Sequence, residues 1–71
     1  MNAQERLEII TDELRIMRYY GIAIPIMANE VERIGTQNQA AQQIMEALNY
    51  FIQNYNHLRN QIQDELDELN L

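Results

Sequence analysis

The apolar residues in the first half of the chain recur at alternating steps of four and three residues. This spacing places them on one side of an α-helix, as in a helix that packs along its whole length against a neighbour. Asn2, followed by Glu5 three residues later, is typical of a helix N-cap and its acidic partner. We therefore predict a helix over residues 3–34 whose seam consists of Ala3, Leu7, Ile10, Leu14, Met17, Gly21, Ile24, Ala28, Val31 and Gly35.

Pro25 lies inside this predicted helix, and the apolar spacing continues through it without a slip. A proline inside a helix removes one backbone hydrogen bond and pushes its ring against the carbonyl group four residues earlier, here that of Gly21. We expect a single long helix with a kink near residues 21–25. The alternative is a pair of helices with a break at Gly21.

A turn is predicted at residues 35–36. Gly35 suits the left-handed conformation that ends many helices, and Thr36 with Gln39 matches a capping box for a following helix. We expect this second helix over residues 37–69. Its apolar residues repeat the same spacing, with three further residues widening the seam: Ala41, Ile44, Leu48, Phe51, Tyr55, Leu58, Ile62 and Leu69, then Met45, Ile52 and Leu66.

Two helices of matched length joined by a tight turn form an antiparallel hairpin, which we expect to be one domain over residues 1–71. In the expected register, residue i lies near residue 71 minus i, roughly. This register predicts four neighbouring pairs: Gly21 with Tyr50 and with Phe51, Ala28 with Ile44, and Arg6 with Glu65.

The first helix carries more apolar residues than its seam uses. We call this second set the outer stripe, and it consists of Ile9, Ile16, Ile22, Ile26, Met27 and Ile34. Since each helix of a hairpin buries only one side of the other, the outer stripe would form an exposed apolar patch on a lone molecule. We predict an all-α fold in which hairpins assemble into a homo-oligomeric helix bundle, with Met45 and Ile52 also in the interface.

Composition limits the partners of this chain. It has 71 residues, 11 acidic residues, five arginines, no lysine and a net charge of −6. Because nonspecific nucleic-acid binding depends on cationic contacts with phosphates, we expect no direct binding to nucleic acids or to anionic membranes. The chain has no cysteine, so no disulfide supports its small core. We find neither a signal-peptide pattern nor an apolar run long enough to span a membrane, so we expect the cytoplasm as its location.

The residue types argue against an enzyme. Serine, cysteine and lysine are absent, and Thr36 is explained as a cap, which leaves few nucleophiles. The only histidine, His57, lies off the apolar seam and lacks neighbours at metal-ligand spacing. The carboxylates near both chain ends lack the Glu-x-x-His motif of di-metal helix bundles, so we expect no metal and no cofactor.

Positive charge and aromatic rings occur together at one place, in Arg15, Arg18, Tyr19 and Tyr20. Guanidinium groups suit phosphates and tyrosine rings suit base stacking, so this cluster is a candidate site for a small anionic, nucleotide-like ligand. The plainer interpretation is two interfacial tyrosines and two arginines that neutralise nearby acids. In the expected register, the opposite helix contributes Tyr50, Gln53 and Asn54 to the same place.

In size and outline, the chain is similar to small helical hairpins such as plasmid-encoded RNA-binding dimers and phage-encoded inhibitors or sequestering oligomers. It lacks the basic face that the plasmid type requires. The resemblance is one of shape, and it implies a phage or mobile element as the source. We expect a non-enzymatic oligomer that binds another protein as an inhibitor or adaptor. The alternatives are a sequestering binder of a small anionic ligand at the protomer interface and a structural assembly subunit.

Overall fold

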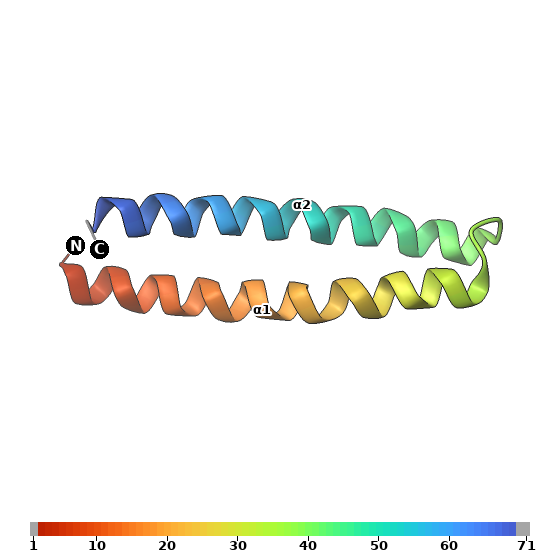
Figure 1. The fold of residues 1–71 in the computed structure, drawn as a ribbon, viewed down its shortest axis with the longest axis horizontal. Helices are drawn as coiled ribbons and strands as arrows, with labels where there is room; N and C mark the ends of the chain where they lie inside the picture. Colours follow the sequence, from red (N-terminus) through yellow and green to blue (C-terminus); the bar gives the residue numbers. More distant parts are fainter. Residues whose placement is uncertain (1, 70–71) are drawn as a thin grey trace.

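Two long helices, α1 (Ala3–Ile34) and α2 (Gln39–Glu68), lie antiparallel and side by side (Figure 1). The structure is a computed structural model that describes residues 2–69. Within these residues the only elements are the two helices and the loop between them, which confirms the predicted all-α hairpin. The start of α1 and the end of α2 meet at one end of the molecule, and the loop closes the other end.

The hairpin is long and thin. Its extents are 50 × 16 × 14 Å and its radius of gyration is 15.9 Å. A compact domain of this length would have a radius of gyration of about 11 Å. Because no second layer of helices covers the pair, each helix has only one neighbour to pack against.

Both ends of α1 follow the sequence prediction. The Asn2 side chain accepts a hydrogen bond from the Glu5 backbone N–H at 2.8 Å, and its amide donates to the Glu5 carboxylate at 3.4 Å. At the other end Gly35 has φ +98°, and its N–H donates to the Val31 carbonyl at 2.9 Å. The helix continues through Gly21 and Pro25, so the alternative with a break at Gly21 is wrong. The kink near residues 21–25 stays a prediction.

The start of α2 differs from the prediction. Its N-cap is Asn38, whose side-chain oxygen accepts from the Ala40 backbone N–H at 2.8 Å, whereas Thr36 lies in the loop and caps nothing. The Asn38 N–H donates to the Gly35 carbonyl at 3.1 Å and closes the loop as a turn. Asn is as good a cap as Thr, and this position leaves room for the reversal before the helix resumes.

The later start of α2 shifts the register of the hairpin. Arg6 pairs with Glu68 at 3.2 Å and not with Glu65, and Tyr20 contacts Asn54. The residue numbers in each of these pairs total 74, where the sequence prediction assumed 71. A longer loop moves the second helix along the first, because the residues in the loop no longer take part in pairing.

The neighbour of Gly21 is displaced in the same direction. A Cβ atom built on Gly21 would lie 3.7 Å from Cε2 of Tyr55, so this glycine faces Tyr55 and the prediction that it faces Tyr50 is wrong. The general expectation of a small residue on α1 opposite a large residue on α2 still applies at this point.

The side of α1 that faces α2 is also different from the predicted seam. Ile10, Met17, Ile24 and Val31 face α2 as predicted. The seam positions between these four are occupied by other residues than expected. Glu13 is buried at 8% exposure, while Leu14 beside it is 43% exposed. The observed seam of α1 consists of Arg6, Ile10, Glu13, Met17, Tyr20, Ile24, Met27, Val31 and Ile34, all buried or half-buried.

The two seams have the same spacing and differ in phase. The predicted positions include Gly21 and Ala28, which have little side chain to bury, whereas the observed seam gains Tyr20, Met27 and Ile34. Burying a large apolar side chain contributes about 1.5–3 kcal/mol. The observed phase also exposes Leu7 and Leu14 and buries the Glu13 carboxylate, so its net gain is smaller than three full burials.

Candidate interaction surface

Large apolar side chains cover much of the outside of the hairpin. Among residues 2–69, four hydrophobic residues are buried, namely Ile10, Val31, Ala41 and Ile62. In the same part of the chain, ten large hydrophobic residues are exposed: Leu7, Ile9, Leu14, Ile16, Tyr19, Ile22, Ile26, Met45, Tyr50 and Ile52. Many large apolar side chains of the two helices therefore lie outside the packing between them.

The outer stripe divides into two parts. Ile9, Ile16, Ile22 and Ile26 are exposed, as a docking surface requires. Met27 and Ile34 are half-buried and belong to the observed seam, so placing them outside the hairpin's own packing was wrong. Met45 and Ile52 of α2 are exposed and remain available to a partner.

A hollow of about 380 Å³ lies on α1 over the predicted ligand cluster and is lined by Arg15, Arg18, Tyr19 and Ile22. Arg15 forms an exposed ion pair with Asp12 at 3.4 Å. Within residues 2–69 no carboxylate pairs with Arg18. Arg15, Arg18 and Tyr19 therefore line one shallow, open site.

The remaining members of the predicted ligand set lie elsewhere. Tyr20 packs edge-on against Phe51, with ring centroids 5.1 Å apart and an interplanar angle of 79°. Its hydroxyl accepts a hydrogen bond from the Asn54 amide at 3.4 Å. Tyr20 and Asn54 thus belong to the packing between the helices, and the hollow beside Arg15 includes neither of them.

Tyr50 and Gln53 are exposed on α2, outside the same hollow. The seven predicted ligand residues are therefore not gathered into one site. Three of them, Arg15, Arg18 and Tyr19, come together on α1 because steps of three and four residues place side chains on one side of a helix.

Glu13 is the charged residue that sequence reasoning missed. Both of its carboxylate oxygens are buried without a hydrogen-bond donor. Burial raises the pKa of Glu13, and the neighbouring Glu65 carboxyl on α2 raises it further. The signal was present in the heptad that links Glu13 to Tyr20, Met27 and Ile34, a second possible seam.

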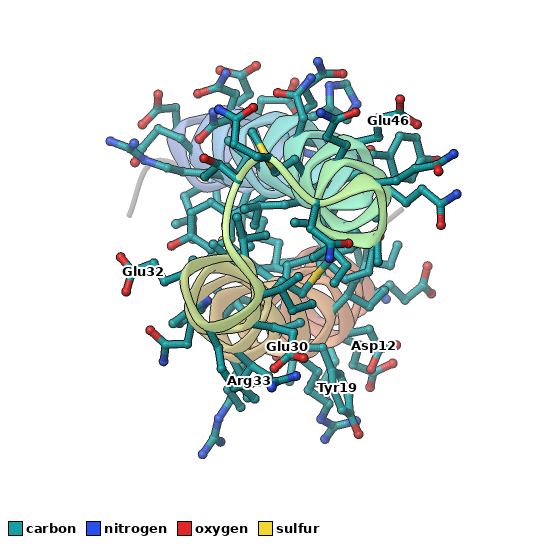
Figure 2. The ribbon with its side chains drawn as sticks, turned by 90° about the vertical axis from the view of Figure 1, so that its right-hand side faces the viewer. Asp12, Tyr19, Glu30, Glu32, Arg33 and Glu46 are labelled. Atoms are coloured by element: carbon teal, nitrogen blue, oxygen red, sulfur yellow. The ribbon has the colours of Figure 1, made fainter. Side chains whose placement is uncertain are left out.

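A tight ion pair lies on the outer surface of α1 near the loop. The Arg33 guanidinium donates to the Glu30 carboxylate through Nε at 3.0 Å and through Nη2 as well. This contact lowers the pKa of Glu30 and raises that of Arg33. Figure 2 shows both side chains, with Asp12 and Tyr19, on the side of α1 away from α2.

The described residues offer little for metal chemistry. Over residues 2–69 no group of three or more His, Asp or Glu side chains is arranged to hold a metal ion, and His57 is exposed. In the same part of the chain, neither helix has an apolar stretch of the length that crossing a membrane requires. Comparison with protein families, with curated proteins and with solved structures found no match to this chain.

Proposed function

We propose that this protein is not an enzyme and acts by protein–protein binding: it associates with copies of itself in the cytoplasm and binds another protein as an inhibitor or adaptor. The observation that carries the proposal is the exposed apolar surface. Four of the six outer-stripe residues are exposed, and no helix of the hairpin covers them.

The surface area supports the same conclusion. The chain exposes 5552 Å², whereas a compact monomer of 8.4 kDa would expose about 4,600 Å². The excess of roughly 900 Å² is close to the ~800 Å² per partner that a standard protein interface buries. Association of two hairpins would therefore bring the exposed surface per chain to the value expected of a compact protein.

The test is light scattering coupled to native mass spectrometry on the purified protein at micromolar concentration. We expect a mass of two or more copies, which falls towards 8.4 kDa on dilution. A folded species of 8.4 kDa at every concentration would contradict the proposal. The same spectra report any small molecule that purifies with the protein.

A second candidate function is the capture of a small anionic ligand. It is favoured by the 380 Å³ hollow, which is lined by Arg15, Arg18 and the exposed Tyr19. Replacing Arg15 and Arg18 with Ala separates the two functions. Loss of activity with the oligomer intact would favour ligand capture, and loss of activity only together with loss of the oligomer would favour the protein-binding surface.

A further inference from the structure

The outward side of α1 carries a row of apolar side chains that the hairpin does not use. Tyr19, Ile22 and Ile26 are exposed at 76%, 53% and 63%, the highest values among the large apolar residues of α1. Their steps of three and four residues place them in line along the helix, as in a helix-pairing seam. Figure 2 shows Tyr19 pointing away from α2. We call these three residues the outward row.

Each end of the outward row is flanked by an ion pair. Asp12 and Arg15 precede it, and Glu30 and Arg33 follow it. These four residues continue the row at steps of three and four, and Figure 2 shows Asp12, Glu30 and Arg33 on the same side of α1. Along the helix the order is acid, base, apolar row, acid, base.

We infer that a second copy of this chain packs against the outward row with its α1 antiparallel to the first, centred between Ile22 and Ala23. This inference rests on the proposed self-association and specifies its surface and direction. In the antiparallel arrangement, Arg33 of the second copy lies opposite Asp12, and Glu30 of the second copy lies opposite Arg15.

The charges distinguish the two directions of packing. The antiparallel arrangement sets opposite charges against each other at both ends of the row, and the symmetry of the dimer repeats these contacts. A parallel arrangement would place Asp12 against Asp12 and Arg33 against Arg33. Like charges set against each other disfavour an interface, so the charge order selects the antiparallel direction.

The shape of the surface fits the same arrangement. Arg15, Arg18, Tyr19 and Ile22 line the 380 Å³ hollow, and their spacing of i, i+3, i+4 and i+7 is that of the four residues that receive one side chain of a facing helix. In the antiparallel register, Ile26 of the second copy faces this hollow. Each copy thus provides one hollow and one isoleucine to fill it.

The first experiment uses the absence of cysteine from the chain. Ile22→Cys places a thiol near the twofold axis of the dimer, so mild oxidation should convert most of this variant into a covalent dimer. Tyr50→Cys is the control, because Tyr50 is exposed on α2 outside the row. Failure of Ile22→Cys to cross-link, or equal cross-linking of both variants, would overturn the assignment of this surface.

The second experiment tests the direction by exchanging charges. Asp12→Arg should weaken association about tenfold or more, because it faces Arg33 of the second copy. Asp12→Arg combined with Arg33→Asp should restore most of the affinity. The two positions are about 32 Å apart along α1, so recovery has to come from a contact between chains. A cross-linking Ile22→Cys variant without this recovery would indicate parallel packing and overturn the inference.

Sedimentation equilibrium of the unaltered protein tests self-association separately from the surface and direction of packing. A monomer at all concentrations would refute self-association and this inference together. If the protein forms an oligomer, but Ile22→Cys does not cross-link and the charge exchange does not change the affinity, only the surface and direction assigned here would be refuted.

Discussion

Replacing Glu13 with Gln should stabilise the hairpin at neutral pH. Glu13 occupies a seam position of α1 at 8% exposure, and neither of its carboxylate oxygens has a hydrogen-bond donor. Glutamine has nearly the same shape, carries no charge, and has an amide that donates to the Glu65 carboxylate on α2. The substitution therefore keeps the packing and removes the unpaired buried charge.

The size of the effect follows from the cost of a buried polar group without a partner, about 1–3 kcal/mol. For a domain of this size, 1 kcal/mol corresponds to a change in melting temperature of about 4–8 °C. Glu13→Gln should thus raise the melting temperature by several degrees or more at pH 7.5.

The pH dependence has a definite sign. The pKa of Glu13 is raised in the folded state above its ordinary value of 4.5, chiefly by burial and then by the facing Glu65 carboxyl. A group with a raised folded pKa contributes stability that is fully present below its unfolded pKa and is lost as the pH rises through the folded pKa. The advantage of Glu13→Gln should therefore be small near pH 4 and should grow as the pH rises above 4.5.

The assay is thermal unfolding followed by circular dichroism at one protein concentration over pH 4–8. Glu8→Gln is the matched control, because Glu8 is exposed on the same helix and loses the same charge. The control accounts for the general relief of repulsion in a chain of net charge −6. Equal stabilisation by the two variants, or parallel pH profiles, would refute the reasoning about Glu13.

Two further predictions test the parts of the fold that differ from the sequence pattern. Asn38→Ala should destabilise the hairpin by about 1 kcal/mol, because the Asn38 side chain caps α2 through the Ala40 N–H, whereas Thr36→Ala should change stability by less than about 0.5 kcal/mol. Urea unfolding of both variants measures this difference, and a larger loss for Thr36→Ala would place the cap where the sequence suggested. Ile10→Ala should cost about 2–5 kcal/mol because Ile10 is buried, while Leu14→Ala on the exposed side should cost much less. Similar losses for the two variants would contradict the observed seam.

The candidate surface was predictable only in part. Ile9, Ile16, Ile22 and Ile26 are exposed, as expected because α1 has more apolar residues than one packed side of a hairpin can bury. The ligand cluster was predicted from neighbours in sequence, but adjacent residues on a helix point about 100° apart. Tyr19 therefore faces outward while Tyr20 packs against Phe51.

The sequence by itself determined the helices, because their signals are local. Asn2 and Gly35 mark the ends of α1 through hydrogen bonds and a positive φ that involve only nearby residues. The alternating spacing of apolar residues identifies long amphipathic helices, and a single reversal between two of them leaves the antiparallel hairpin as the simplest arrangement.

The tertiary structure alone decided the phase and the register. Two seams of equal spacing share Ile10, Met17, Ile24 and Val31, and the choice between them depends on how much apolar side chain each one buries against α2. The register depends on where α2 begins, so the cap at Asn38 goes with displaced pairs such as Arg6 with Glu68 and Tyr20 with Asn54. A helix can form from its own sequence, but which side it buries and which residues it meets are settled only by the helix that packs against it.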